Sequence, residues 1–507
     1  MRKWLPLIAV CLGAFMLLVD VTIVTVALPD MATSLHTGFA DLQWVMDIYA
    51  LALAALLLGA GSLADLVGRR AVYLGGLVLF ALASLACGLS GSSGELIAFR
   101  GLQGIGGAAM FATTMALLSS TYQGRGRGIA FGVWGAVNGA AAAAGPILGG
   151  LLTEHLDWRW IFYVNLPISA LAVLVTLRAV RESRNPHATG VDLPGLVTFT
   201  VAAGVLTFAL IRGGDYGWTS TTTLGLLALS ALSLLAFVLI ESRSRRPMLD
   251  LGLFRNRTFL GVMTGGLLLS VAAFSYLVYA SLWLQSVRGM SPVTAGLSLL
   301  PMSAVSFVTA ALVGRLLHGA SPRLTIGGGL LLIGAGALLQ ATVDADSTWT
   351  ALAPGLALTG AGVGLATPTL ASTAMAAVPP TRAGMAGGAL NTSRQLGNAL
   401  GIAVLGAVFK SGLLDSLHSN PGTENAHRTA EALTGGQAAA LIAHTPADQR
   451  PAVLHLIHTA FATGLRDTFL LSAALGLAGA LTTLTLLRPA PTPQPAPHPS
   501  EPTPANA

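Results

Sequence analysis

Two oppositely charged residues lie inside long apolar stretches of this sequence, where a charge is costly. Asp20 interrupts an aliphatic stretch over 5–29, and Arg100 lies near the start of another over 96–119. Asp20 is about nine residues from the outer end of its stretch, hence ~14 Å deep at 1.5 Å per helical residue. Arg100 has a comparable depth, and a buried charge needs a partner or water. The two side chains are therefore predicted to pair.

The chemistry that this pair offers is proton handling. A carboxyl group that is exposed alternately to the two sides of a membrane can load a proton on one side and release it on the other. A neighbouring guanidinium tunes that exchange. The alternative is a permanent ion pair that only fixes helix packing, and the sequence leaves both interpretations open.

A compact polar turn separates the second and third apolar stretches. It reads Gly-Ser-Leu-Ala-Asp-Leu-Val-Gly-Arg-Arg over 61–70. Glycine permits a tight turn, aspartate caps a helix N-terminus, and the arginine pair suits a cytoplasmic loop. An ordinary positive-inside loop explains the arginine pair alone, but the full spacing is more specific. The candidate residues of this turn are Gly61, Asp65, Gly68, Arg69 and Arg70.

A degenerate copy of this turn appears at 314–323. Gly314 aligns with Gly61 and Arg323 with Arg70, while His318 stands at the acidic position. Duplicated halves are typical of secondary transporters.

Other polar and small residues inside the apolar stretches indicate close helix packing and a cavity. The stretch 135–150 is rich in Gly and Ala, which let helices approach, and its proline bends a helix; a generic packing face is the alternative. The candidate residues of this stretch are Gly145, Pro146, Gly149 and Gly150. The candidate cavity residues are Asp47, Gln103, Asn138, Asn391, Arg394 and Gln395. Asp47 is either a second acidic site or interfacial, and Arg394 either contacts substrate or is structural.

No pattern for covalent, metal or nucleotide chemistry emerges. His455 and His458 share a helical face, but two histidines without a further ligand make a poor metal site. Neither lysine follows a glycine, so the phosphate-binding lysine motif is absent from the sequence. We therefore expect no enzyme activity, no cofactor and no metal, with a proton gradient as the energy source.

The elements that must position these residues are membrane helices. The chain has 507 residues, 53% hydrophobic and 9% charged, whereas soluble domains carry about 25% charged residues. A span needs about 20 apolar residues, and the sequence offers fourteen windows. They are 5–29, 44–63, 71–89, 96–119, 128–152, 161–177, 193–211, 223–240, 259–284, 294–317, 324–342, 349–377, 383–409 and 468–487.

Charge placement sets the orientation. Most Lys and Arg fall in the gaps on the side of the N-terminus, which predicts that both termini are cytoplasmic. The same placement argues against nucleic acid as a partner, despite the net charge of +6. The lipid bilayer is the partner that it favours.

The expected domain plan follows the spans. It comprises a first six-helix bundle over 1–185, two extra helices over 186–241, a cytoplasmic linker over 242–258, a second six-helix bundle over 259–488 with an external loop over 410–467, and a disordered proline-rich tail over 489–507. Within the external loop, amphipathic surface helices are predicted near 438–442 and 453–461.

Together these residues resemble the major facilitator superfamily. The turn 61–70 is similar to its loop motif between spans two and three. Arg100 with Gln103 and Gly104 is similar to its fourth-span motif, and 145–150 to the fifth-span motif associated with antiporters. Segments that resemble the fourteen-span drug:proton antiporter branch are 20–29, 158–167, 247–259 and 391–401.

The resemblance implies an all-α polytopic membrane protein with the major facilitator fold, whose two six-helix bundles and two extra helices surround a cavity that opens alternately to each side. It implies that Asp20 couples protons and that Arg100 tunes it. It further implies that Asp65 with the arginine pair latches the inner gate, and that Pro146 governs the rocking of the bundles.

The predicted function is export of amphipathic small molecules, antibiotics or drugs, in exchange for protons, by a monomer in a bacterial plasma membrane. One alternative is a proton-coupled or facilitative transporter of a single metabolite, in either direction. A remote alternative is a non-transporting membrane sensor, which leaves Asp20 and Arg100 unexplained.

Overall fold

The apolar stretches are helical, as lipid requires, because a helix satisfies its own backbone hydrogen bonds. The computed structural model describes residues 2–487 except 38, 185–191, 245–246, 317–319, 380–381, 420–425, 435–437, 444 and 447. Within these residues every assigned element is an α-helix or a short 3-10 helix. Twelve helices in this part of the chain are long and apolar enough to cross a membrane, so the protein is a multi-pass membrane protein.

The chain forms an N-terminal group, a pair and a C-terminal group of helices. After η1 (Arg2–Trp4), the N-terminal group is α1 (Leu5–Ser34), α2 (Phe39–Val67), α3 (Arg69–Leu89), α4 (Ser93–Thr121), α5 (Gly124–His155), α6 (Trp160–Tyr163) and α7 (Asn165–Ala179). The pair is α8 (Leu193–Tyr216) and α9 (Thr221–Arg243). The C-terminal group is η2 (Leu251–Arg255), α10 (Arg257–Phe274), α11 (Leu277–Ser286), α12 (Pro292–Ser298), α13 (Leu300–Leu316), α14 (Pro322–Gln340), η3 (Trp349–Ala351), α15 (Ala353–Ala376), α16 (Ala383–His418), α17 (Ala426–Thr434), α18 (Ala438–Ala443) and α19 (Arg450–Leu486).

Each predicted span falls on one helix or on two consecutive short ones. Two of the predicted spans are not among these twelve helices. One is α5, and the other is formed by α12 and α13 together. The helical class is therefore confirmed, and the count of fourteen stays a prediction. His318 and the tail 489–507 lie outside the described residues.

The predicted external loop 410–467 consists largely of helical extensions of two spans. Helix α16 runs on to His418, and α19 begins at Arg450. A short surface helix near 438–442 is present as α18, but the one expected near 453–461 is the first part of α19. Apolar residues there continue the face of the last span, so a separate helix was the wrong interpretation.

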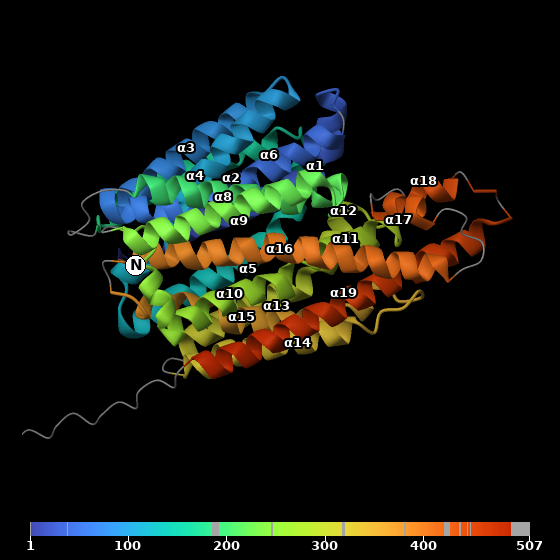
Figure 1. Cartoon of the computed structure of the whole chain (residues 1–507). Helices are drawn as coiled ribbons and strands as arrows, with labels where there is room; N and C mark the ends of the chain where they lie inside the picture. The colour runs from blue at the N-terminus through green and yellow to red at the C-terminus, as the bar shows by residue number, and fades with distance from the viewer. Residues whose placement is uncertain are drawn as a thin grey trace, which may run out of the picture.

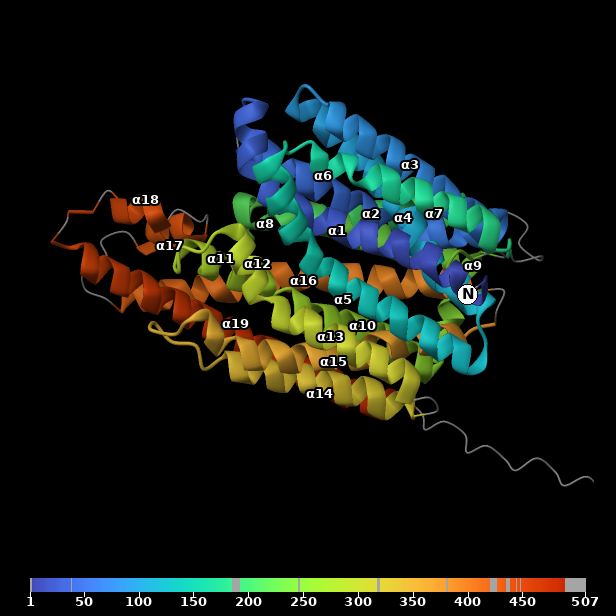
Figure 2. The ribbon, with the colours of Figure 1, turned by 180° about the vertical axis from the view of Figure 1, so that it is seen from behind.

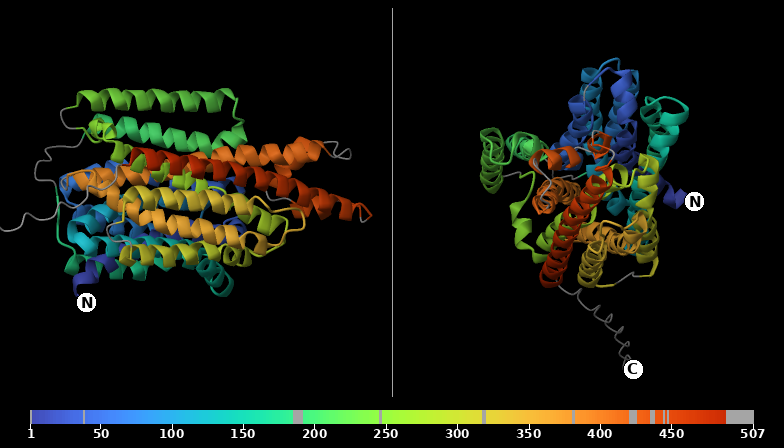
Figure 3. Two further views of the ribbon diagram at one scale, coloured as in Figure 1. Left: turned by 90° about the horizontal axis from the view of Figure 1, so that it is seen from below. Right: turned by 90° about the vertical axis from the view of Figure 1, so that its right-hand side faces the viewer.

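Helix direction gives the bundle two ends. We call the end where α1 begins and α2 ends the amino end, and the opposite one the distal end. Figure 1 shows the N-terminal helices and the C-terminal helices close together at the amino end and splayed apart toward the distal end. Seen from behind, α5 lies between α1 and α13 (Figure 2). The pair α8 and α9 lies on the outside of the bundle (Figure 3) and packs on α2 and α16 through α8.

Small residues let neighbouring helices meet backbone to backbone. A Cβ placed on Gly329 of α14 would lie 2.6 Å from the carbonyl oxygen of Gly362 on α15. One placed on Gly61 of α2 would lie 2.7 Å from the carbonyl oxygen of Gly384 on α16. In lipid such close packing replaces the hydrophobic effect as the force between helices.

Candidate functional site

Asp20 lies inside the N-terminal group, on the middle turns of α1, and is fully buried. Its Oδ2 accepts a hydrogen bond from Arg100 Nη1 of α4 at 2.5 Å, and its Oδ1 accepts from Gln103 Nε2 at 2.9 Å. Asn165 Nδ2, at the start of α7, donates to the same Oδ1 at 3.1 Å. The structure therefore places Asp20 in contact with Arg100, the residue that lies at the same depth in the sequence, and also in contact with Gln103.

A second layer of contacts holds the donors in place. Gln103 Nε2 also donates to Ser84 Oγ of α3 at 2.7 Å, and its Oε1 accepts from Arg100 Nη1 at 2.7 Å. The Ser84 hydroxyl also accepts from Asn165 at 3.3 Å. Asp20 is thus fixed by side chains of α4 and α7, which α3 supports in turn, and both of its oxygens are satisfied.

The guanidinium of Arg100 is enclosed by polar and aromatic groups. Its Nε donates to the carbonyl oxygen of Val45 at 3.0 Å, and its carbon lies 4.3 Å from the ring centre of Tyr49. The ring centre of Phe162 is 5.9 Å from the same carbon. A buried carboxylate is tolerable here because it is paired and hydrogen-bonded. Protonating Asp20 removes the attraction that orders this network.

The turn 61–70 forms a contact between the two groups of helices. Asp65 accepts two hydrogen bonds from Arg69, at 2.9 and 2.8 Å, and is almost fully buried. Its two oxygens also accept from the backbone N–H groups of Gly384 and Met385, at 3.1 and 3.0 Å. These N–H groups begin α16, so a carboxylate of α2 caps a helix of the other group. We call this contact the amino-end latch.

A second acidic residue caps α3 at the same end. The carboxylate of Glu182, just after α7, accepts from the backbone N–H groups of Arg70 and Ala71 at 3.0 Å each. Gly68 is needed before them because its φ is +130° and because a Cβ there would meet the Glu182 carboxylate. Arg70 Nη2 donates to the carbonyl of Leu177 at 2.9 Å. The two arginines therefore have different partners. Arg69 binds Asp65 in the amino-end latch, and Arg70 binds a carbonyl of α7.

Helix α5 connects the Asp20 region with the C-terminal group. A Cβ on Gly145 would lie 1.8 Å from Thr22 Oγ1, two residues beyond Asp20 on α1. On its other side, Gly139 approaches Ser303 of α13, and Gly150 approaches Val293 of α12. Gly149 is buried, and α5 is helical across Pro146. The predicted small-residue stretch is therefore a two-sided packing face.

Asp47 lies apart from the Asp20 network. It lines a small recess between α2 and α8 together with Trp44, Leu51, Phe208 and Arg212. The Arg212 guanidinium lies 4.7 Å from the ring centre of Trp44, which stacks on Phe208. The structure thus places this acid against the extra helix pair, in the company of a buried arginine.

The remaining candidate cavity residues lie on helices that face between the two groups. Asn391 Nδ2 of α16 donates to the carbonyl of Phe111 on α4 at 3.0 Å, while its Oδ1 is buried without a partner among the described residues. Asn138 Oδ1 on α5 and Arg394 Nε on α16 are also buried without a described partner. Gln395 is half-buried beside Arg394.

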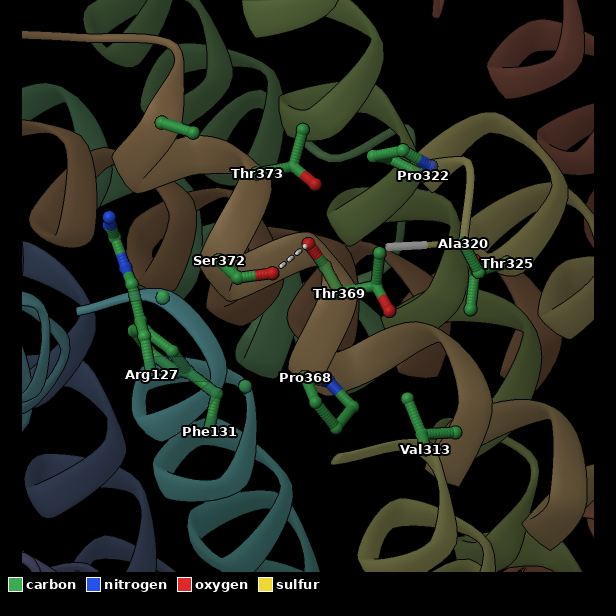
Figure 4. Close-up of a pocket in the computed structure, with 13 residues that line it drawn as sticks. Arg127, Phe131, Val313, Ala320, Pro322, Thr325, Pro368, Thr369, Ser372 and Thr373 are labelled. Carbon is green, nitrogen blue, oxygen red and sulfur yellow. Dashed lines mark hydrogen bonds between the residues drawn. The ribbon is translucent and has the colours of Figure 1, made fainter. Parts of the chain in front are cut away.

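A cavity of about 310 Å³ opens at the amino end, between α5 and the C-terminal group. Arg127 and Phe131 of α5 line one side, and Pro368 and Ser372 of α15 line another (Figure 4). Ser372 Oγ donates to the carbonyl of Thr369 inside it. Sequence analysis missed this cavity because its lining comes from several helices that are distant in the sequence.

Two site residues were also missed by sequence analysis, namely Asn165 and Ser84. Asn165 follows the aromatic turn at 158–163, and a polar residue at the head of an apolar helix was its only signal. Among the described residues no three His, Cys, Asp or Glu side chains cluster closely enough to hold a metal ion.

Comparisons with known proteins show the family and the fold. Residues 10–402 match the family described as Major Facilitator Superfamily. The chain is 41% identical over 414 residues to the Multidrug resistance protein Stp of Mycobacterium tuberculosis, covering 82% of this chain and 77% of that protein. It is 34% identical over 496 residues to the Tetracenomycin C resistance and export protein of Streptomyces glaucescens, covering 95% and 91%. The structure also superposes on the proton:xylose symporter XylE with a TM-score of 0.63 at 12% identity, covering 96% of each chain, which shows a shared fold.

Proposed function

The chain belongs to the Major Facilitator Superfamily, and on that premise we propose that it exports amphipathic small molecules, antibiotics or drugs, in exchange for protons. The resistance and export functions in the names of its relatives support the direction of transport. The bacterial sources of those relatives support a location in a bacterial plasma membrane. Fourteen spans, as in the drug:proton antiporter branch, are part of the proposal.

The observation that carries the proton-coupling proposal is the buried Asp20 network. An intramembrane carboxylate is expensive and usually serves transport, and Asp20 is the acceptor on which Arg100, Gln103 and Asn165 converge. When Asp20 takes a proton, it attracts Arg100 less strongly. The network then reorders, and α1 shifts against its neighbours.

The contact between Thr22 and Gly145 passes this shift to α5. Because α5 packs on α13 and α15, a movement of α1 changes how the two groups of helices meet. Pro146 and the glycines beside it give α5 the freedom to bend. We assign to this segment the rocking of the two bundles about each other.

The amino-end latch keeps the cytoplasmic side closed in this conformation. Asp65 holds the first turn of α16, while the helices splay toward the distal end (Figure 1). We assign this arrangement to the outward-facing conformation as part of the proposal. Opening the latch would turn the cavity beside Arg127 into an entrance from the cytoplasm.

The test is efflux of lipophilic dyes, ethidium and Nile red, together with a panel of antibiotics, from sensitive bacteria that express the protein. Wild type is compared with Asp20→Asn, with and without a protonophore. Asp41→Asn is the matched control, because Asp41 lies at the distal end of α2, where its carboxylate accepts from Thr37 and Ser93 and not from the Asp20 network. We expect efflux by wild type and Asp41→Asn, abolished by the protonophore, and none by Asp20→Asn at equal expression.

Other outcomes separate the alternatives. Efflux by Asp20→Asn equal to wild type would show that coupling lies elsewhere, and Asp47 would be tested next. Uptake in place of efflux would favour an importer, and movement of a single antibiotic would favour a transporter of one metabolite. Wild-type efflux that survives the protonophore contradicts proton exchange.

A further inference from the structure

Arg394 is half-buried in the helical core and differs from the two buried arginines Arg100 and Arg69. Arg100 pairs with Asp20 and Arg69 with Asp65, and each pair has the hydrogen bonds that a buried ion pair needs. Arg394 makes no ion pair with a described residue, and its Nε is buried without a described hydrogen-bond partner. The guanidinium of Arg394 is half-buried in the helical core, and nothing in the described part of the chain neutralises its positive charge.

The position of Arg394 on α16 sets where that charge lies. Gly387, Asn391, Arg394 and Asn398 are spaced at i, i+4, i+7 and i+11, so they share one face of the helix. Asn391 contacts the carbonyl of Phe111 on α4, and Gly387 faces the same helix. Arg394 therefore lies on the face between the two groups, one turn beyond the point where α16 touches α4.

The stem of Arg394 is held by the C-terminal group. A Cβ on Gly266 of α10 would lie 3.4 Å from Arg394 Cγ, and the neighbouring Ser393 donates to the carbonyl of Met263 on α10 at 2.8 Å. These contacts fix the side chain at its base. The guanidinium at the end of the side chain has no partner in the described part of the chain, and it is left to bind another molecule.

Two further unpaired polar atoms lie at the same depth. Trp134 of α5, Thr367 of α15 and Arg394 are each roughly ten residues, or ~15 Å, from the helix terminus that lies at the amino end of the bundle, which for α15 is its C-terminus. Trp134 Nε1 and Thr367 Oγ1 are buried without a partner among the described residues. Helices α5 and α15 pack together across the boundary between the two groups. We infer from this shared depth that the three residues belong to one site, which we call the Arg394 site.

We propose that the Arg394 site binds the transported molecule, and that this molecule carries one acidic group, a carboxylate or an ionised phenol, on an apolar body. This inference rests on the proposed exporter function. The planar guanidinium fits a carboxylate through paired hydrogen bonds, and in a medium of low polarity such a bond is strong. Trp134 offers a further donor and an aromatic surface for the apolar body.

The probes that test the proposal are 1-pyrenebutyrate and its neutral amide, 1-pyrenebutyramide. They share the apolar body and differ in charge. Binding to the full chain in lipid nanodiscs is followed by energy transfer from protein tryptophans to pyrene, at matched lipid content. We expect wild type to bind the acid at least tenfold more tightly than the amide.

The variants separate charge recognition from damage to the fold. Arg394→Gln should weaken binding of the acid about tenfold and leave the amide unchanged, while Arg394→Lys should keep part of the preference. Arg288→Gln is the matched control, since Arg288 also belongs to the C-terminal group but lies at the distal end, where its Nη2 donates to the backbone carbonyl of Asp346 at 2.9 Å. If Arg394→Gln does not fold, the comparison of Arg394→Lys with wild type decides the question.

Contrary results overturn the inference. They are equal binding of acid and amide by wild type, no binding of the acid, or loss of both probes together in a folded Arg394→Gln. Proton-driven dye efflux that persists with any of these results would leave the exporter proposal standing without the Arg394 site. Acid-selective binding by a protein that shows no efflux would do the reverse.

Discussion

Gly145 of α5 and Thr22 of α1 touch so closely that no side chain fits between them. A Cβ on residue 145 would lie 1.8 Å from Thr22 Oγ1 and 3.2 Å from the backbone nitrogen of Ile23. Thr22 in turn donates to the carbonyl oxygens of its own helix, at 3.2 Å, which limits its freedom to move away. The contact lies two residues from Asp20, the candidate for proton coupling. The packing of α5 and the proposed proton coupling therefore depend on the same part of α1.

The substitution Gly145→Ala should therefore destabilise the protein and slow transport. Overpacking of this kind costs about 1–3 kcal/mol, more than the helix propensity of alanine returns. Gly126→Ala, also on α5, is the control, because a Cβ there meets nothing within 4 Å. Thermal unfolding in detergent and dye efflux are measured for both. Equal melting temperatures for Gly145→Ala and Gly126→Ala would refute the close contact.

The amino-end latch makes a prediction about conformation. Asp65→Asn removes a charge that pairs with buried Arg69 and caps α16. Of these contacts, the cap on α16 is the one that joins the two groups, and losing such a cap costs about 0.5–2 kcal/mol, which changes the ratio of closed to open molecules by roughly 2- to 30-fold. Spin labels on Val67 and Leu324, both exposed at the amino end, should report longer distances in the variant.

The matched control for the latch is Asp250→Asn. Asp250 pairs with Arg382 at the same end, but both side chains are partly exposed, and such pairs contribute little. Its distance distribution should stay that of wild type. A distribution in Asp65→Asn that matches this control would show that the latch does not hold the gate.

Much of this arrangement was predictable from the sequence, and the limits have physical causes. Depth within two apolar stretches was enough to pair Asp20 with Arg100, since both charges need a partner in lipid. The partners of Asp65 were not predictable, because Gly384 lies 319 residues away and contributes only a backbone N–H group. Residue type carries no signal for such a contact.

Local patterns also misled where tertiary packing decided the outcome. The residues near 453–461 resemble a surface helix, yet they lie in α19, which continues without a break into the last span. For Asp47, either a second acidic site or an interfacial residue stays the prediction, and only the placement of α8 shows that it shares a recess with Arg212 and Trp44. Asn165 gave almost no signal, because its role depends on other helices that converge on Asp20.

A pH-dependent contribution to stability is expected from Asp41, at the distal end of α2. Thr37 and Ser93 donate hydrogen bonds to its Oδ2 at 2.6 and 3.0 Å, and these bonds lower the pKa of Asp41. Because the pKa is lower in the folded state, ionised Asp41 stabilises the fold above the unfolded value of about 3.9. This contribution is lost as the pH falls through the folded pKa.

The measurement is the melting temperature of wild type and Asp41→Asn between pH 3 and 6. Wild type should melt higher at pH 5–6, and the difference should shrink as the pH falls below about 4. A difference that is constant over the whole range would mean that the Asp41 charge does not stabilise the fold.

If the Arg394 site carries an acidic substrate, membrane potential should drive the acid more strongly than its neutral analogue. Whatever number of protons enters, exporting a monoanion moves one more charge than exporting the amide. One charge is worth about 2.3 kcal/mol per 100 mV, so each ~60 mV adds a further tenfold to the steady-state gradient of the acid. Proteoliposomes with potassium gradients and valinomycin set the potential, and pyrene fluorescence reads the gradients of 1-pyrenebutyrate and 1-pyrenebutyramide. Equal slopes against potential would mean that the acid crosses in its neutral form, and Arg394 would then not meet a carboxylate during transport.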